Sequence, residues 1–495
     1  MATPKDILSV KRPTNTFVVA YGKNHDRYAV RKYIGCRYDK GRRIPIKGPT
    51  VGHIRNGVYV PLESDRAARM PQVDLLDWAN VALCDRLLGP TLAELRQFYS
   101  PEESLTLYTI AILRVCNPGV SDYELKEKYE ESFLSVLHPG VALSKNTVCK
   151  FHVRIGRTCS RIIKFMRKRA EAIGADGHVL IDGTLKSNES RVNSLADFSR
   201  KAKTKGTRDI SVLYAFDLDR NEPACSQCYP GNMLDVTSYG DFIDKCHIRR
   251  GVIVADKGFP SSASESHRRA NPDLHQLNPI RRNSKFIETH RLYEYDGVLP
   301  GREGITYRKA TVKGGKKWLY SYRDASLAAR EERAYLEKAK KDGSYCHADF
   351  QERQKTFGTI VLECDLDLDP EKVYQMYEER WEIEVVMRYY KEACEFDETR
   401  VHNDYSVIGS EFCNFLSTVL TFRLIKAFDG KGLLKKKNYS RLMAILRRAK
   451  KVRVDGGEWN LIRVNPSVQE MLAKLELMPS ERQGTGVGEV SGGSV

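Results

Sequence analysis

The sequence predicts an α/β protein with a mixed sheet and flanking helices, a β-rich insertion and a mostly helical N-terminal region. Three short apolar runs, "HVLIDGT" from residue 178, "ISVLYAFDLD" from residue 210 and "GVIVADKGF" from residue 251, alternate with helical segments. Such runs are typical of strands buried on both faces of a sheet. A helical pattern from about residue 75 to 173 precedes them, and a predicted hairpin with a glycine turn follows them.

The charge of the chain favours a polyanionic partner. The 495 residues carry a formal net charge of +17, and 41% of them are hydrophobic. An excess of this size favours nucleic acid as the partner, although a basic protein without such a partner remains an alternative. There is no apolar run of about 18 residues, and the N-terminus lacks the apolar core of a secretory signal. We therefore expect an intracellular protein with no membrane partner.

Shifts in composition divide the chain into seven predicted segments. They are a small β-rich region (1–70), a helical, DNA-binding region (71–175), the first part of the sheet domain (176–284), a β-rich insertion (285–368), the second part of the sheet domain (369–428), a basic helical region (429–478) and a disordered tail (479–495).

The helical region contains two segments that suggest DNA contact. "SDYELKEKYEESF" and "SKNTVCKFHVRIGRTCSRIIKFMRKRAEA" are separated by "HPG", with Ser121 and Ser144 as predicted N-caps. The second segment is rich in Lys and Arg, as expected of a helix that enters a DNA groove. Helix pairs are also common scaffolds, so a purely structural role stays open.

The cysteines point to buried thiols. The only close pair, "CSQC" at Cys225 and Cys228, would need two more ligands to bind zinc, for which Cys246 and His247 are candidates. No regular second pair exists, so we favour reduced thiols packed in the core.

One predicted helix places charged groups along a single stripe. In "YEERWEIEVVMRYYKEACEF", Tyr377, Arg380, Glu384, Arg388 and Lys391 recur at intervals of three, four and seven residues, which share one helical face. A carboxylate flanked by cations and a phenol suits a site where metal and phosphate meet. A solvated face with ion pairs between residues four apart is the alternative.

Two aspartates strengthen the prediction of a metal site. Asp182 follows the apolar run "VLI" and Asp256 follows "VIVA", so each is predicted to lie where an apolar strand ends. Three converging carboxylates repel one another unless cations compensate them, and two divalent ions about 4 Å apart would do so. Oxygen ligands favour Mg²⁺ or Mn²⁺. Each aspartate taken alone also fits a helix cap or a turn.

These motifs resemble the DDE transposases of bacterial insertion sequences, specifically the insertion-sequence-four group. That group carries the signature Y-x2-R-x3-E-x6-K, which matches Tyr377, Arg380, Glu384 and Lys391. Asp182 in "LIDGT" and Asp256 in "IVADKGF" resemble its first and second acids, and "PGNMLDVTSY" from Pro230 resembles a segment found ahead of the second. The resemblance covers about residues 178 to 425 and implies an RNase H-like core.

The resemblance also implies roles for individual residues. Asp182, Asp256 and Glu384 would be catalytic and hold two Mg²⁺ ions, with Mn²⁺ able to substitute. The following residues would bind DNA phosphates: Tyr377, Arg380, Arg388, Lys391 and Lys257. Trp318, with Tyr320 and Tyr322 behind it, would stack on a flipped base, unless it simply packs within its own hairpin. Asp217 and Asp219 are alternatives to Asp182 as the first acid.

The implied activity is cleavage of the ends of an insertion sequence and their joining to target DNA. The implied partners are the terminal inverted repeats, target DNA and a second copy of the chain, in the bacterial cytoplasm at the nucleoid. A catalytically inactive, sequence-specific DNA-binding protein with the same fold is the alternative. A glycosidase with paired carboxylates explains neither the basic excess nor the Arg/Lys stripe. The run from Lys431 to Arg453, with ten basic residues and no acid, would bind phosphate or form a solvated amphipathic helix.

Overall fold

The computed structural model describes residues 3–39, 41–62, 72–188, 190–199, 206–233, 235–254, 271–312, 316–380 and 401–478. Contacts divide the chain into two compact units. The first comprises Met1–Leu75 with Lys451–Leu461, and the second comprises Leu76–Lys450 with Ile462–Val495.

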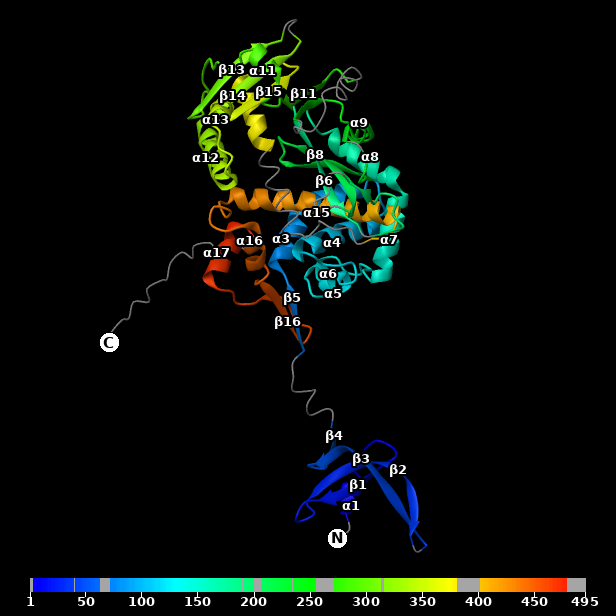
Figure 1. The fold of residues 1–495 in the computed structure, drawn as a ribbon. Coiled ribbons are helices and arrows are strands. Elements are labelled where there is room, and N and C mark those ends of the chain that lie inside the picture. Colours follow the sequence, from blue (N-terminus) through cyan, green and yellow to red (C-terminus); the bar gives the residue numbers. More distant parts are fainter. Residues whose placement is uncertain are drawn as a thin grey trace, which may run out of the picture. The chain divides into compact units, whose positions relative to one another are not determined.

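The first unit contains a four-stranded antiparallel sheet (Figure 1). Its strands, in both chain and spatial order, are β1 (Thr16–Tyr21), β2 (Arg27–Asp39), β3 (Arg42–Arg55) and β4 (Val58–Pro61), after a short helix α1 (Lys5–Leu8). The expectation of a mostly helical N-terminal region is therefore wrong for these residues, which agree instead with the small β-rich region expected for residues 1–70. Alternating basic and apolar residues build extended strands here, and the described helices of the predicted helical region start with α3 (Ala79–Leu95).

The second unit is built around a mixed sheet. Within the described residues, ten strands join it, and three of them form an antiparallel group: β6 (His178–Ser187), β8 (Arg208–Asp217) and β9 (Glu222–Pro230). On the other side of β6 lie β10 (Gly251–Val254) and β11 (Leu274–Pro279), parallel to it and to each other. This arrangement, with helices against it, is consistent with the expected RNase H-like core.

The insertion continues the same sheet. β15 (Thr359–Cys364) pairs antiparallel with β11, and β14 (Trp318–Asp324), β13 (Ile305–Thr311) and β12 (Gly297–Val298) follow in order. The predicted hairpin is the β13–β14 pair. The segment also contains three helices, α11 (Lys285–Thr289), α12 (Ala325–Asp342) and α13 (His347–Gln354). A two-residue strand, β7 (Asp197–Phe198), ends the sheet beside β8.

Helices form the layer beneath the sheet (Figure 1). The N-terminal ones are α3 (Ala79–Leu95), α4 (Pro101–Cys116), α5 (Leu125–Glu130), α6 (Leu134–Leu137), α7 (Lys145–Arg157) and α8 (Cys159–Ala170), and α9 (Asp235–Cys246) precedes β10. Ser144 caps α7 as predicted, by accepting a hydrogen bond from the Thr147 backbone. α5 starts later than expected, because Ser121 instead donates to Glu124 in the preceding turn.

The longest described helix, α15 (Asp404–Gly430), is buried on nearly all sides. Its aromatic residues stack on the sheet, as Phe415 does on Tyr214 and Phe422 on Phe216. On its other side α15 crosses α7 at two glycines. A Cβ on Gly409 would lie 2.1 Å from the His152 carbonyl oxygen, so only glycine permits this approach. No helix among the described residues has both the length and the apolar character needed to cross a membrane.

The basic C-terminal run is not one helix. α16 (Tyr439–Leu446) ends early, and the chain then enters β16 (Lys450–Val454), which lies between β17 (Asn460–Leu461) and β5 (Val73–Asp77). The expected amphipathic helix around "YSRLMAILRRAKK" is therefore wrong in its second half. The last described helix is α17 (Pro466–Lys474).

Candidate active site

Asp182 lies in the middle of β6, whereas the apolar pattern placed it at the strand's end. The strand continues through Ser187, and the four residues before Asp182 are buried while Asp182 is half-buried and Gly183 is exposed. Its carboxylate accepts a hydrogen bond from the Gly183 backbone at 2.8 Å. Asp182 and Tyr214 are register partners, so the carboxylate is on the face of the sheet that packs against α15.

The pairing of β6 with the parallel strand β10 is relevant to Asp256, the predicted second acid. Leu180 of β6 pairs with Val254, the last residue of β10. Asp182 comes two residues after Leu180, and Asp256 comes two residues after Val254. Asp256 itself lies outside the described residues. So do Lys257, Glu384, Arg388 and Lys391.

A buried ion pair anchors β6 next to Asp182. Lys186, four residues further along the strand and on the same face, contacts Glu411 of α15, with 2.6 Å between Nζ and Oε2. The two side chains are only 2% and 3% exposed. An ion pair withdrawn from water to this extent requires further hydrogen bonds, and Asn414 supplies one to the other oxygen of Glu411 at 3.0 Å.

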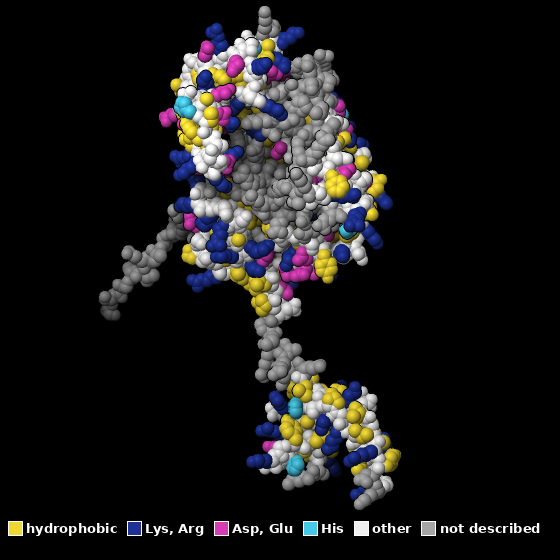
Figure 2. All heavy atoms as spheres, viewed as in Figure 1, with side chains coloured by type: hydrophobic (Ala, Val, Ile, Leu, Met, Phe, Trp, Pro, Cys, Tyr) yellow, Lys and Arg dark blue, Asp and Glu magenta, His cyan; other side chains and the backbone are white. Residues whose placement is uncertain are grey.

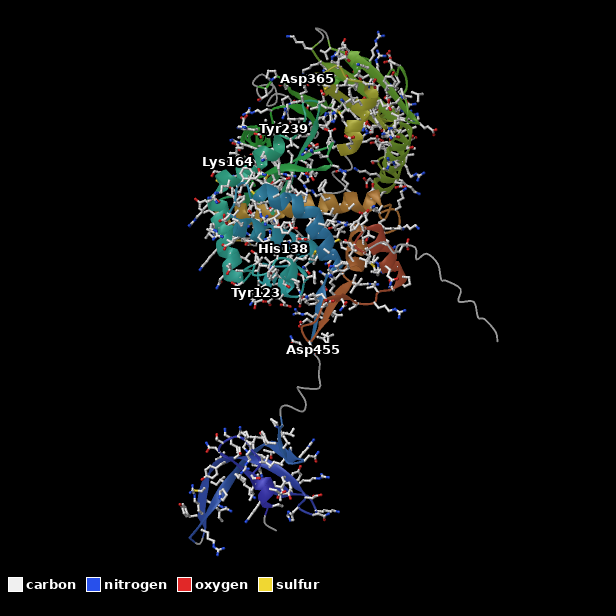
Figure 3. All side chains as sticks on the ribbon, turned by 180° about the vertical axis from the view of Figure 1, so that it is seen from behind. Tyr123, His138, Lys164, Tyr239, Asp365 and Asp455 are labelled. Carbon is white, nitrogen blue, oxygen red and sulfur yellow. The ribbon has the colours of Figure 1, made fainter. Side chains whose placement is uncertain are left out.

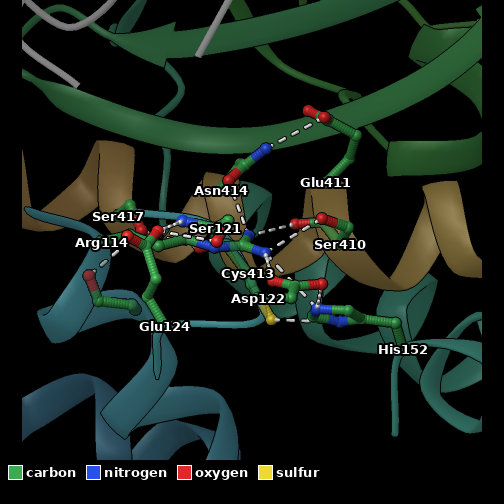
Figure 4. Close-up of polar contacts among 11 residues, drawn as sticks. Arg114, Ser121, Asp122, Glu124, His152, Ser410, Glu411, Cys413, Asn414 and Ser417 are labelled. Carbon is green, nitrogen blue, oxygen red and sulfur yellow. Dashed lines mark hydrogen bonds and ion pairs between the residues drawn. The ribbon is translucent and has the colours of Figure 1, made fainter. Parts of the chain in front are cut away.

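The polar contacts continue from Asn414 into the helical layer (Figure 4). Arg114 of α4 donates to Asn414 Oδ1 at 2.7 Å, to Ser410 and to Asp122 Oδ1 at 3.0 Å. Asp122 in turn contacts His152 of α7, 3.2 Å away. We call the six residues Lys186, Glu411, Asn414, Arg114, Asp122 and His152 the buried polar chain. It links the strand that carries Asp182 to α4 and α7.

Within the buried polar chain, the pKa shifts indicate which side chains are charged. Burial raises the pKa of Asp122, but hydrogen bonding from His152 and the charge of Arg114 outweigh burial and hold that pKa well below its usual range. Burial lowers the pKa of His152, which outweighs the opposing effect of Asp122. Asp122 is therefore ionised near neutral pH and His152 is neutral, so Arg114 carries the compensating charge.

Sequence analysis missed the buried polar chain. The available signal was a Glu and an Asn at positions 411 and 414 inside an otherwise apolar helical run. A charged group on a helix that is buried all round requires a partner. The sequence alone does not say which of its many Lys and Arg residues is that partner.

Residues 370–380 form the beginning of the helix that carries the Tyr/Arg stripe. Asp369 caps it by accepting a hydrogen bond from the Glu371 backbone at 2.8 Å. Two buried tyrosines of β14 position the loop before it. Tyr320 donates to the Leu368 carbonyl at 3.0 Å and Tyr322 to the Pro370 carbonyl at 2.7 Å. Both rings are fully buried, so these two tyrosines hold the helix start instead of lying open to a base.

Tyr377 and Arg380, the first two residues of the signature, are 8% and 9% exposed. Tyr377 lies beside a cavity of about 430 Å³ between the end of β11, β15 and this helix. Arg281 and Arg282 also line it, and Arg282 is held by Glu331 through two hydrogen bonds of 2.7 and 3.0 Å. Glu331 lines the cavity as well, so one carboxylate stands beside the phenol and the two guanidinium groups, and Arg281 supplies the excess positive charge for an anion.

Trp318 begins β14 and is half-buried. The ammonium group of Lys309, on the neighbouring strand β13, lies over its indole, 4.9 Å from the ring centroid. Lys309 also pairs with Asp367 and donates to the Leu368 carbonyl. A cation on an aromatic face stabilises the indole in a fixed orientation.

Asp217 and Asp219, the alternatives for the first acid, and the cysteines considered for zinc lie in environments that differ from that of Asp182. Asp219 accepts two hydrogen bonds of 2.8 Å from His178, at the opposite end of β6 from Ser187. Asp217 is buried, and this raises the pKa of its carboxyl. Cys225 and Cys228 are three apart on β9 and so belong to opposite faces of the strand. The described residues contain no group of three His, Cys, Asp or Glu that could hold a metal ion.

A basic surface runs along α7 and α8, seen from behind in Figure 3 with Lys164 labelled. Neither helix contains an acidic residue. The following seven side chains are exposed: Lys145, Lys150, Arg154, Arg157, Arg161, Lys164 and Lys168. Glu103 of α4 pairs with Arg154 and Arg161. We call these seven residues the α7–α8 surface.

The comparisons with known proteins agree with part of this description. Residues 174–407 match the family described as "Transposase DDE domain". This range is just under half of the chain, so it identifies the domain and not the whole protein. No curated protein matches. Among solved structures, the chain is similar to a piggyBac transposase synaptic complex with hairpin DNA, determined by cryo-EM. The sequence identity is 14%, with 79% of this chain and 78% of that chain covered. The TM-score of 0.37 is too low to support an inference.

Proposed function

We propose that this chain is a transposase that cleaves the ends of an insertion sequence and joins them to target DNA by two-metal-ion phosphoryl transfer. One observation carries the proposal. Leu180 and Val254 are register partners on adjacent parallel strands, and each is followed two residues later by an aspartate. If the pairing continues, Asp182 and Asp256 stand side by side, about 5 Å apart between backbones. Two carboxylates so close repel each other, and a bound cation would stabilise both in their charged form.

The donor groups fit Mg²⁺ or Mn²⁺. Asp182, Asp256 and Glu384 offer only carboxylate oxygens, which hard divalent ions prefer. Asp182 is half-buried and Gly183 after it is exposed, so an ion there would have access from solvent. When bound, two ions would activate a water or a 3′-hydroxyl and stabilise the leaving oxygen of a phosphodiester.

The residues of the chain would then bind and orient the DNA. We propose that Tyr377, Arg380, Arg388 and Lys391 bind phosphates at the cleaved end, and that Lys257 does so beside the second acid. Tyr377 is already directed to the cavity that Arg281 and Arg282 line. Guanidinium groups bind phosphate through paired hydrogen bonds. We also propose that Trp318 stacks on a flipped base, where the Lys309 ammonium would hold the indole in place.

The α7–α8 surface is the proposed contact for duplex DNA outside the cleaved bond. Seven exposed cations on two consecutive helices attract backbone phosphates without regard to sequence. Because α7 packs on α15 and the buried polar chain joins it to β6, DNA held on this surface is positioned relative to Asp182.

The test is cleavage of labelled duplex DNA that carries the inverted repeats flanking the coding sequence, with and without Mg²⁺. We expect the wild-type chain to nick the repeat end only with Mg²⁺ or Mn²⁺. Glu384→Gln and Asp182→Asn should abolish nicking and leave DNA binding within about threefold, since both keep the side-chain size. Nicking by either variant contradicts the assigned site. DNA binding without nicking by the wild type favours the inactive DNA-binding alternative.

A further inference from the structure

The first 62 residues account for most of the net positive charge of the chain. They contain thirteen Lys or Arg, three Asp and no Glu, so their net charge is +10 (13 − 3) out of +17 for 495 residues. These residues belong to the compact unit that holds the four-stranded sheet. None of the residues assigned to catalysis, to the cleaved end or to the flipped base lies in it. An excess of this size favours a polyanionic partner for these residues themselves.

Half of this sheet is a two-stranded arm. β1 pairs with β2 only from Arg27 to Lys32, and β4 pairs with β3 only from Gly52 to Arg55. Beyond those residues β2 and β3 continue together, from the pair Tyr33↔Lys47 to the pair Asp39↔Arg42. We call residues 33–39 and 41–47 the ribbon. Its seven-residue strands extend about 23 Å at the usual rise per residue.

The side chains of the ribbon are both cationic and apolar, as Figure 2 shows for the arm of the first unit. Arg37 is exposed opposite Ile44, and exposed Arg43 is opposite Tyr38. Basic side chains therefore lie on both faces, because register partners share a face. Three large apolar side chains are also exposed: Tyr38 at 73%, Ile34 at 58% and Ile46 at 41%.

This combination distinguishes the ribbon from a solvated hairpin. A hairpin that only avoids aggregation needs its charges but gains nothing from three exposed apolar side chains. One of the arginines is pre-oriented, since Arg43 donates to the Tyr33 hydroxyl at 3.1 Å. Register shifts between Val30 and Cys36 increase the local twist of the pair, which follows the curvature of a groove better than a flat ladder.

We propose that the ribbon inserts into the major groove of duplex DNA. The major groove of B-DNA, about 12 Å wide, admits a two-stranded ribbon, and its base edges offer both acceptors for Arg and methyl groups for apolar side chains. Cations on both faces would reach the phosphates on either side. The major groove of duplex RNA is too deep and narrow for this contact, so the inference is specific to DNA. It rests on the proposed function, because a transposase must hold the DNA it cleaves.

The test uses the full-length chain and a labelled mixed-sequence DNA duplex of about three helical turns. The ribbon variant is Arg37→Ala/Arg42→Ala, and the matched control Lys11→Ala/Lys23→Ala removes the same charge from exposed positions outside the ribbon. We expect the ribbon variant to bind at least about tenfold more weakly, with the slope of log K against log salt reduced by about two, and the control to lose less than about threefold. In the wild-type complex, guanine N7 in the major groove should be protected from dimethyl sulfate, and the ribbon variant should lose this protection.

Each outcome separates the inference from the proposed function. If both double variants lose affinity equally, or if guanine N7 stays reactive in the wild-type complex, the ribbon does not enter the major groove, while the transposase proposal stands. If the ribbon variant weakens binding to a matching RNA duplex as much as to DNA, the contact is with the backbone alone and the inference is wrong. If the wild type binds no DNA, the proposed function itself fails.

Discussion

Lys186 and Glu411 form an ion pair that is almost completely excluded from solvent, although 225 residues separate them in the sequence. Lys186 is four residues from Asp182 on the same face of β6, and Glu411 lies in α15 beneath it. The pair therefore sets the distance between the strand that carries the first predicted acid and the helix that supports the sheet. Asn414 and Arg114 extend this connection into α4.

We expect Lys186→Met to lower the free energy of unfolding by about 3–5 kcal/mol, because it leaves the Glu411 carboxylate buried without its cation. Urea denaturation followed by circular dichroism measures the loss. The double variant Lys186→Met/Glu411→Gln removes both charges and keeps an oxygen for Asn414 to donate to, so it should recover most of the stability. A double variant as unstable as the single one would contradict the view that the isolated charge is the cause.

Asp122 should make stability depend on acid. Because its folded pKa is held below the usual range, the unfolded chain binds a proton that the folded chain does not. The contribution is thus fully present above about pH 5 and is lost as the pH falls below the ordinary aspartate pKa near 4. We expect Asp122→Asn to cost about 2–3 kcal/mol at pH 7. The difference from wild type should shrink by about 1 kcal/mol when unfolding is measured at pH 3, well below the ordinary aspartate pKa. A constant difference would mean that another group accounts for the acid sensitivity.

The crossing of α7 and α15 should not tolerate a methyl group. Gly409→Ala would bring a Cβ within 2.1 Å of the His152 carbonyl oxygen, and Gly156→Ala within 1.9 Å of that of Tyr405. We expect each change to cost about 2–3 kcal/mol, since the helices must separate. Gly430→Ala, in the last turn of α15, is the matched control. Its Cβ would meet no heavy atom within 4 Å, so the better helix propensity of alanine should raise the free energy of unfolding by up to about 1 kcal/mol.

Trp318→Ala should reduce nicking of the repeat end by about tenfold, and Trp318→Phe by much less, if the indole stacks on a flipped base. A 2-aminopurine placed at the end of the repeat reports this directly, because its fluorescence rises when the base leaves the stack. The wild type should raise the fluorescence and Trp318→Ala should not. An equal rise with both would show that Trp318 only packs within its hairpin, over the Lys309 contact.

Three of the predicted strands were recognised from short runs of apolar residues. β6, β8 and β10 have that pattern because both faces are buried. β11, "LHQLNP", does not, because its polar side chains are hydrogen-bonded: the His275 ring to Asp365, and the Gln276 amide oxygen to the Asn278 amide, which donates to it. The sequence predicts Asp182 at the end of its strand because the apolar run stops there. The polar residues after it continue the strand by pairing with β8, which hydrophobicity does not reveal.

Contacts between segments far apart in the sequence could not be predicted either. The sequence indicated the hairpin of residues 305–324 through local alternation and a glycine turn, but it could not show that β15 joins this hairpin to β11 across some 80 residues. The Lys186–Glu411 pair has the same cause, since each charge has many possible partners until the fold selects one. The Tyr/Arg stripe was predicted from its spacing and the two aspartates from the apolar runs before them, and their roles stay predictions.

Arg380 offers the sharpest test of phosphate binding within the described residues. Its side chain is only 9% exposed and lies on the helix whose start Tyr320 and Tyr322 hold. We expect Arg380→Ala to weaken the complex with a nicked repeat end by about 10- to 100-fold, since a lost charged hydrogen bond costs about 1.5–3 kcal/mol. The complex with uncut DNA should change by less than about threefold. Arg302→Ala is the control, because Arg302 is 42% exposed and pairs with Glu378 on the same helix. Both affinities are measured by fluorescence anisotropy in Ca²⁺ instead of Mg²⁺, to limit further cleavage. Equal losses on the nicked and uncut duplexes would assign Arg380 to general DNA attraction or to folding, and a melting curve of the free protein would distinguish these two.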